Sequence, residues 1–263
     1  MDLGIKNKVA LVTAASQGLG KASAMELANE GVKLAICSRD QDKINQTAEE
    51  IQNLSGAEVL AVKANLDSTD DIENLIKEIE NKFNTVDILV NNTGGPKAGF
   101  FDDLSDEDWL KTFESTFLSA VRVTRKVLPF MKKNKWGRII NISSVSAKQP
   151  IDNLMLSNGV RMSIHGWAKT LSNQVASENI LINNVCPGFT HTERVDALIK
   201  TQVENSNSSR EEIIESIASD IPAKRVGQAN ELAALVVFLS SEKASYITGQ
   251  SIAVDGGISS LPI

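Results

Sequence analysis

Residues 9–20 read Val-Ala-Leu-Val-Thr-Ala-Ala-Ser-Gln-Gly-Leu-Gly. The apolar residues at the start of this stretch predict a buried parallel strand, and the small residues and glycines that follow predict a sharp turn into a helix. Such a turn points free backbone N–H groups above the sheet, where the helix dipole favours an anion. A nucleotide pyrophosphate is the anion we expect there, and the alternative is an ordinary tight strand-to-helix turn.

Beyond this stretch, strand-like apolar runs alternate with helical periodicity along the whole chain. This alternation predicts an α/β fold in which a doubly wound parallel sheet carries helices on both faces. With 263 residues, 42% of them hydrophobic, the chain is long enough for a single domain over residues 1–263. We expect further strands over 32–37, 59–64, 86–90, 138–144, 181–186 and 251–255, and long helices over 105–134 and 153–178.

The composition argues against several classes of partner. A net charge of −6 and a pI near 5.1 leave no basic field to attract a nucleic acid or an anionic membrane surface. The start of the sequence holds only a four-residue apolar run, so we expect neither a signal peptide nor a membrane span. Cys37 and Cys186 lie in apolar runs, which suits reduced thiols in the cytoplasm. His165 and His191 lack metal-ligand spacing, so no metal site is predicted.

The end of the second predicted strand indicates which dinucleotide binds. In a doubly wound nucleotide-binding fold this position faces the adenosine ribose, and an acidic residue there would bind the 2′-hydroxyl. Ser38 occupies that position and Arg39 follows it. A guanidinium favours a 2′-phosphate, so NADP is expected over NAD, with a surface arginine as the alternative. By position, Asn65 and Leu66 after the third strand would lie near the adenine.

Several motifs in register resemble those of the short-chain dehydrogenase/reductase family, and of its 3-oxoacyl-[acyl-carrier-protein] reductase-like members in particular. They are Thr13-x4-Gly18-x-Gly20, residues 91–94 (Asn-Asn-Thr-Gly), residues 187–192 (Pro-Gly-Phe-Thr-His-Thr) and residues 246–250 with 255–257. One glycine of the first motif is replaced by Ala14, which is tolerable if the backbone keeps a negative φ.

The resemblance implies a Rossmann-like fold and a homotetramer built on the helices over 105–134 and 153–178. The cofactor-binding residues that follow from the resemblance and from position are Thr13, Ser16, Gln17, Gly18, Leu19, Gly20, Ser38, Arg39, Asn65, Leu66, Asn92, Gly94, Arg161, Pro187, Gly188, Thr190 and Thr192.

The catalytic residues of the family are only partly present. The resemblance places the family's serine at Ser144, its tyrosine at Ser157, its lysine at Arg161 and its asparagine at Thr116. No shift of register supplies the missing phenol, because the only tyrosine of the chain is Tyr246. The site is therefore an atypical one, with Ser-x3-Arg in place of Tyr-x3-Lys.

These replacements change the acid–base chemistry that the site can perform. A phenol with a pKa of about 10 is tuned toward neutrality by a nearby cation, whereas the aliphatic hydroxyl of Ser157 is a far weaker acid and also reaches less far. Arg161 keeps a positive charge but cannot transfer a proton. His191, in the loop expected over the nicotinamide, is a candidate proton donor, or else a surface residue. His165 is expected to be a core or interface residue.

Two functions are consistent with this sequence. The first is an NADP(H)-dependent oxidoreductase that interconverts a small-molecule carbonyl and a secondary alcohol. Ser144 would polarise the substrate oxygen, Ser157 and Arg161 would occupy the family's acid–base positions, and water, the cofactor ribose or His191 would move the proton. The second is a dinucleotide-binding sensor that has lost turnover. Residues 193–220, a polar and charged insertion, are expected to form a lid over the substrate pocket, or else a solvated pair of surface helices.

Overall fold

The computed structural model describes residues 1–204, 206 and 208–260. Its main sheet has seven parallel strands in the order β3-β2-β1-β4-β5-β6-β9. The predicted parallel sheet is therefore confirmed. The strands are β1 (Val9–Val12), β2 (Lys33–Ser38), β3 (Val59–Lys63), β4 (Ile88–Asn91), β5 (Gly137–Ile142), β6 (Ile180–Pro187) and β9 (Ser251–Val254).

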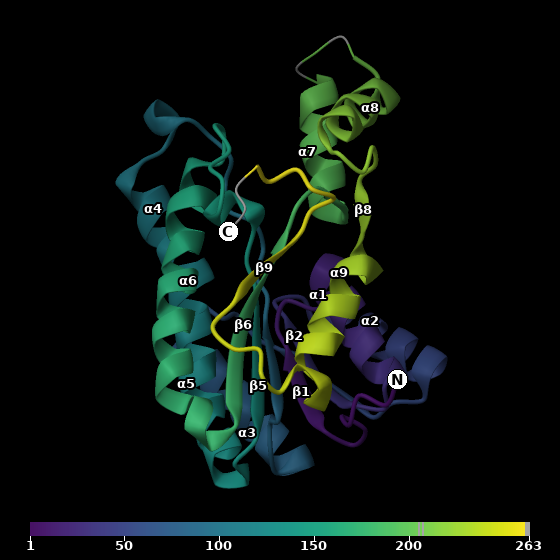
Figure 1. Ribbon diagram of the computed structural model, residues 1–263, viewed down its shortest axis with the longest axis vertical. Coiled ribbons are helices and arrows are strands. Elements are labelled where there is room, and N and C mark those ends of the chain that lie inside the picture. Colours follow the sequence, from purple (N-terminus) through teal and green to yellow (C-terminus); the bar gives the residue numbers. More distant parts are fainter. Residues whose placement is uncertain (205, 207, 261–263) are drawn as a thin grey trace.

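Helices cover both faces of this sheet (Figure 1). One layer consists of α1 (Gly18–Asn29), α2 (Gln41–Ser55) and α9 (Ala229–Leu239), and the other of α3 (Thr69–Phe83), α5 (Ser119–Asn134) and α6 (Met155–Val175). Successive strand residues point to opposite faces, so Ala10 and Val12 join the first core and Leu11 joins the second. Burial on both faces explains why the strands read as continuous apolar runs.

The helix predicted over 105–134 is interrupted in the structure. It consists of α4 (Asp106–Thr112), a π-helical segment over Phe113–Leu118 and α5, whereas we expected one continuous helix. A π segment shifts the hydrogen-bond register by one residue, and periodicity of apolar residues does not reveal such a shift. Thr116, at the position of the family's asparagine, lies in this segment and is 2% exposed.

The predicted lid forms two helices, α7 (Glu193–Glu204) and α8 (Arg210–Asp220). They project above the carboxyl ends of the strands (Figure 1), and a short sheet of β7 (Thr190–His191) with β8 (Gly227–Gln228) connects them to the domain. Residues 205 and 207 of the predicted lid and residues 261–263 of the predicted domain lie outside the described residues.

The strand order places a crevice where the chain reverses direction across the sheet. Starting from β1, the order proceeds outward through β2 and β3 on one side and through β4, β5, β6 and β9 on the other. In open α/β sheets, ligands bind outside the carboxyl ends of the strands at such a reversal.

Among the helices of the described ranges, none is long and apolar enough to cross a bilayer.

Candidate active site

A cavity of about 1000 Å³ opens at this crevice, between the strand ends and α7. Its volume suits a dinucleotide together with a small substrate. The structure brings most of the predicted site residues to its wall. Those that line it are Ser16, Gln17, Gly18, Leu19, Ser38, Arg39, Asn65, Leu66, Asn92, Gly94, Ser144, Ser157, Arg161, Pro187, Gly188, Thr190 and Thr192.

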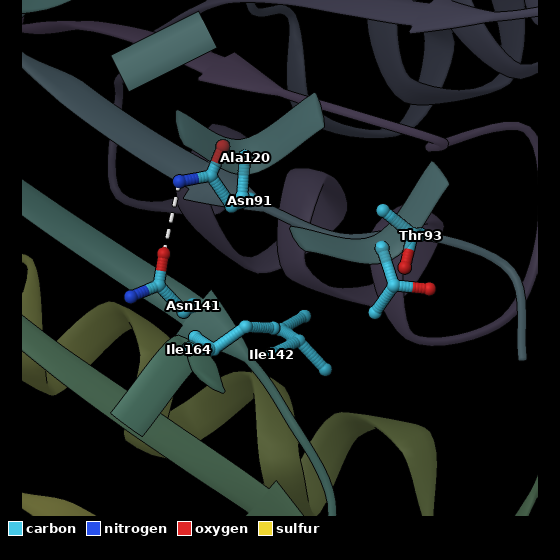
Figure 2. A pocket seen from close by; sticks show the side chains of 7 residues that line it. Asn91, Thr93, Ala120, Asn141, Ile142 and Ile164 are labelled. Carbon is cyan, nitrogen blue, oxygen red and sulfur yellow. Dashed lines mark hydrogen bonds between the residues drawn. The ribbon is translucent and has the colours of Figure 1, made fainter. Parts of the chain in front are cut away.

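A second cavity, seen in Figure 2, is too small to be a substrate site. Its volume is about 10 Å³, which is room for one water molecule at most. Asn91 lies at its wall and donates a hydrogen bond to Asn141 Oδ1 over 2.9 Å, while the buried Asn91 Oδ1 has no hydrogen-bond partner among the residues that the structure describes. The wall also includes Thr116. The large cavity is therefore the candidate active site.

Thr13 and Gly20 support the wall from behind instead of lining it. The hydroxyl of Thr13 lies 2.8 Å from both the backbone N and the backbone O of Asn92, which joins the ends of β1 and β4. A Cβ built on Gly20 would lie 2.6 Å from Ala14 O and 2.6 Å from Asn92 Nδ2. Only glycine fits at this position without a shift of the backbone.

The backbone of Ala14 does not have the negative φ that we expected. Its φ is +46°, in the left-handed region where a Cβ is strained by about 1–2 kcal/mol. The neighbouring turn explains the conformation, because Asn92 Nδ2 donates a 3.0 Å hydrogen bond to Ala14 O and Ala15 N donates one to Cys37 O. The surroundings thus impose a glycine-like conformation on an alanine.

The N-terminus of α1 fits the phosphates of a dinucleotide. Gln17 precedes the helix and makes no side-chain cap, and no acidic residue occupies the first turn. The N–H groups of this turn are therefore free of a side-chain cap and face the cavity together with Ser16, Gly18 and Leu19.

Two charged residues follow β2, Arg39 and Asp40, and they differ in their contacts. Asp40 caps α2 by accepting a hydrogen bond from Lys43 N, and its backbone O accepts one from Ser38 Oγ. Arg39 is exposed, lines the cavity and forms no ion pair within the described ranges. This arrangement suits a phosphate on the adenosine ribose better than a free hydroxyl.

The end of β5 presents a set of hydroxyl groups. Ser144 Oγ accepts a 3.0 Å hydrogen bond from Ser146 N, so its own O–H remains available to donate into the cavity. Ser157 projects from α6, is 5% exposed, and its Oγ lies 2.9 Å from Ser146 Oγ. No tyrosine lies near these hydroxyls, because Tyr246 is fully exposed and absent from the cavity wall.

Arg161 is held one helical turn beyond Ser157. Its side chain is 6% exposed, and Nη1 donates to Ile142 O over 3.1 Å and to Ser143 O over 3.0 Å. Burial, together with the nearby charge of Arg194, lowers the pKa of Arg161 to about 10. The guanidinium therefore remains protonated at neutral pH and faces the cavity as a cation.

Ser143 and His165 form a contact that the sequence did not predict. His165 Nε2 lies 2.9 Å from Ser143 Oγ and 3.7 Å from Cys186 Sγ. Burial lowers the pKa of His165 to about 4, so the imidazole is neutral at pH 7, and burial raises the pKa of Cys186 to about 11. His165 therefore positions Ser143, which lines the cavity, and does not itself donate a proton at neutral pH.

The structure does not bring His191 into the cavity. Its neighbours Thr190 and Thr192 line the wall, whereas His191 does not, because alternate residues of an extended segment point in opposite directions. The candidate proton donor of the sequence analysis is thus misplaced. Arg194 lines the wall instead and donates a 2.7 Å hydrogen bond to Pro96 O across the cavity mouth. The sequence could have indicated Arg194 as a site residue, because it lies two residues after the predicted Pro-Gly loop.

Comparison with known proteins places this site in a family. A family model described as enoyl-(acyl carrier protein) reductase matches residues 13–259. The chain belongs to the short-chain dehydrogenase/reductase family. The resemblance inferred from the glycine loop and the residue 91–94 turn is therefore confirmed.

Individual family members are similar over almost the whole chain. The NADPH-dependent reductase BacG of Bacillus subtilis is 35% identical over 96% of this chain and 98% of its own length. The 3-oxoacyl-[acyl-carrier-protein] reductase FabG of Aquifex aeolicus is 35% identical over 98% of this chain and 100% of its own. The structure of L-sorbose reductase from Gluconobacter frateurii with NADPH and L-sorbose matches with a TM-score of 0.96 and 30% identity, over 99% of this chain and 100% of that one. These names agree with the predicted activity and cofactor.

Proposed function

We propose that this protein is an NADP(H)-dependent oxidoreductase that interconverts a carbonyl compound and a secondary alcohol. The observation that carries the proposal is one continuous cavity, which joins the N-terminus of α1 and Arg39 to the available hydroxyl of Ser144. A nucleotide-binding end and a carbonyl-polarising end thus share one wall. The names of BacG, FabG and L-sorbose reductase support the same activity and cofactor.

Two groups of residues, one in each half of the cavity, would bind the two ends of the dinucleotide. Arg39 would bind the 2′-phosphate, the α1 N-terminus with Gln17 and Gly18 the pyrophosphate, and Asn65 with Leu66 the adenine. Asn92, Gly94, Arg161, Pro187, Gly188, Thr190 and Thr192 would surround the nicotinamide end. Thr13 and Gly20 would act from behind, by fixing the turn.

The reaction needs a hydride and a proton, and the bound nicotinamide supplies the hydride. Ser144 would donate its O–H to the substrate oxygen and stabilise the negative charge that develops on it. Ser157 is too weak an acid to replace a phenol, so the proton would come from water in this open cavity. Residues 193–220 would act as the lid, since Glu193, Arg194, Val195 and Leu198 line the cavity from its outer side.

The role of Arg39 gives the first testable prediction. Wild-type protein should bind NADPH about 10- to 100-fold more tightly than NADH, because charge-assisted hydrogen bonds to a phosphate contribute about 1.5–3 kcal/mol. The variant Arg39→Ala should lose this preference and keep its NADH affinity. Lys33→Ala, which removes a surface cation already paired with Glu58, is the matched control. Titration with each dinucleotide makes the measurement, and equal affinities in the wild type would contradict the proposal.

We also propose a homotetramer that works in the cytoplasm. Large apolar side chains are exposed on α4, on the π-helical segment that follows it and on α6: they are Leu110 at 72%, Phe113 at 38% and Met162 at 53%. A face with this much apolar surface is typical of a subunit interface. The buried free thiols of Cys37 and Cys186 are consistent with a reducing compartment.

Light scattering tests the assembly. We expect a particle with four times the 28.4 kDa mass of the chain at micromolar concentration. Replacing Phe113 and Met162 by glutamate should produce smaller species, because a buried unpaired charge is costly at an interface. Replacing the exposed Leu54, on α2, by glutamate should leave the mass unchanged. A stable wild-type monomer would contradict the tetramer.

The sensor function remains the second candidate, because Ser157 and Arg161 occupy the positions of the family's acid–base pair. A carbonyl panel separates the two functions. The enzyme should consume NADPH with at least one of acetoacetate, ethyl acetoacetate, pyruvate and trifluoroacetophenone. A sensor should bind NADPH and consume none with any member of the panel.

A further inference from the structure

Arg161 is a buried cation, and the described part of the chain places no buried anion beside it. Among the described residues, no carboxylate oxygen lies within ion-pair distance of its guanidinium, which donates hydrogen bonds to the backbone carbonyls of Ile142 and Ser143. The other buried arginine, Arg138, differs in having Glu242 Oε2 at 3.6 Å. Burying a charge is costly unless an opposite charge compensates it. Arg161 therefore calls for an anion from outside the chain.

A second cation faces the same part of the cavity. Arg194, on α7, also lines the cavity, lies close enough to Arg161 for their charges to interact, and forms no ion pair with a described residue. Lys111, on α4, is a further positively charged residue that lines the cavity. Like charges that converge on one space repel one another, and an anion between them would remove the repulsion.

The acidic residues of the cavity lie toward its other half. Asp40 follows β2, Asp67 follows β3, and Glu193 approaches Gly18, with its Oε2 placed 3.4 Å from where a Cβ on that glycine would be. All three are thus on the side of the pyrophosphate and the adenine. The side with Arg161 and Ser144 is positive in a chain whose net charge is −6.

The anion near Arg161 belongs to the substrate. The phosphates of a dinucleotide would lie at the α1 N-terminus and at Arg39, beyond β1, whereas Arg161 contacts the end of β5. A nicotinamide ribose offers only neutral hydroxyls, which do not compensate a buried charge. Starting from the proposed function, we infer that Arg161 and Arg194 bind a carboxylate of the substrate, and that the substrate is an oxo acid whose carbonyl meets Ser144.

Binding of an oxo acid and its ester to the protein saturated with NADP⁺ tests this inference without turnover. The wild type should bind acetoacetate about 10- to 100-fold more tightly than ethyl acetoacetate, as charged hydrogen bonds to a carboxylate require. Arg161→Gln should abolish this preference and reduce NADPH affinity less than acid affinity. Arg161→Lys should retain part of the preference, because it keeps the charge but loses the planar fork.

Arg194→Gln provides a second test in a variant that is expected to fold normally, because Arg194 is exposed whereas Arg161 is buried. We expect Arg194→Gln to reduce the preference for the acid several-fold with an unchanged melting temperature, and Arg210→Gln, farther along the lid, to leave it unchanged. Equal wild-type binding of acid and ester would overturn the inference, as would a loss of NADPH affinity in Arg161→Gln as large as the loss of acid affinity. If the protein binds acetoacetate selectively but reduces no carbonyl compound, only the proposed function is contradicted. If it reduces carbonyl compounds without preferring the acid over its ester, only the inference about the carboxylate is contradicted.

Discussion

Replacing Ser157 by tyrosine and Arg161 by lysine together is expected to raise the rate of NADPH-dependent reduction of a neutral ketone by about 10²- to 10⁴-fold, which is the typical contribution of a general acid. Ser157 lines the large cavity, so a phenol at this position can reach the space next to Ser144. A neighbouring lysine would lower the pKa of that phenol toward neutrality. Trifluoroacetophenone is the appropriate substrate, because it carries no carboxylate that Arg161 would bind.

The two single changes should each have a small effect. Tyrosine at position 157 beside the bulkier Arg161 would be poorly placed, and lysine at position 161 beside Ser157 would have no phenol to activate. The double variant should therefore exceed the product of the singles, as expected for groups that act as a unit. Ser157→Phe combined with Arg161→Lys controls for bulk. A folded, NADPH-binding double variant no faster than the wild type would show that the pocket differs in more than these residues.

Replacing Gly20 by alanine is expected to weaken NADPH binding about 10- to 100-fold, because a displaced loop would lose a hydrogen bond to the charged pyrophosphate, which contributes about 1.5–3 kcal/mol. The added Cβ would meet Ala14 O and Asn92 Nδ2, both at 2.6 Å. Relief requires the glycine loop to move away from the end of β4. The same overpacking should lower the free energy of unfolding by about 1–3 kcal/mol.

Gly166→Ala is the matched control, since a Cβ there meets nothing within 4 Å in its own subunit. Because Gly166 lies one turn beyond Met162 of the proposed interface, light scattering first checks that this variant keeps the wild-type mass. Gly166 lies inside α6, where alanine should stabilise the helix by about 0.5–1 kcal/mol. Titration with NADPH and urea unfolding measure both effects. Wild-type affinity in Gly20→Ala would show that the loop tolerates a side chain and that its geometry does not determine cofactor binding.

The fold was predictable because the signals that specify it are local. The apolar run over residues 9–12 is followed by the glycine loop and a helix, and further apolar runs alternate with helical segments along the chain. Parallel strands that are buried on both faces need such apolar runs. Gly56 and Ser68 also behaved as their types predict, as a left-handed cap of α2 and an N-cap of α3.

The site was predictable where a motif fixes a backbone and unpredictable where packing decides. The lining residues of the loop ends follow from strand order, but the positive φ of Ala14 depends on a hydrogen bond from Asn92, distant in sequence. The exclusion of His191 depends on the alternation of a two-residue strand. That Arg161 has no carboxylate partner among the residues of the described ranges likewise depends on which side chains surround it in three dimensions.

Transfer of deuterium from the cofactor to a carbonyl is the direct test of the proposed oxidoreductase activity. NADPH deuterated at nicotinamide C4, in each of its two stereoisomers, would be incubated with the wild type and acetoacetate, and the product alcohol analysed by mass spectrometry. We predict deuterium on the carbinol carbon from one stereoisomer only, with one NADP⁺ formed per alcohol. Tight NADPH binding with no labelled alcohol, from acetoacetate or from any other member of the carbonyl panel, would contradict the oxidoreductase activity and support the dinucleotide-binding sensor.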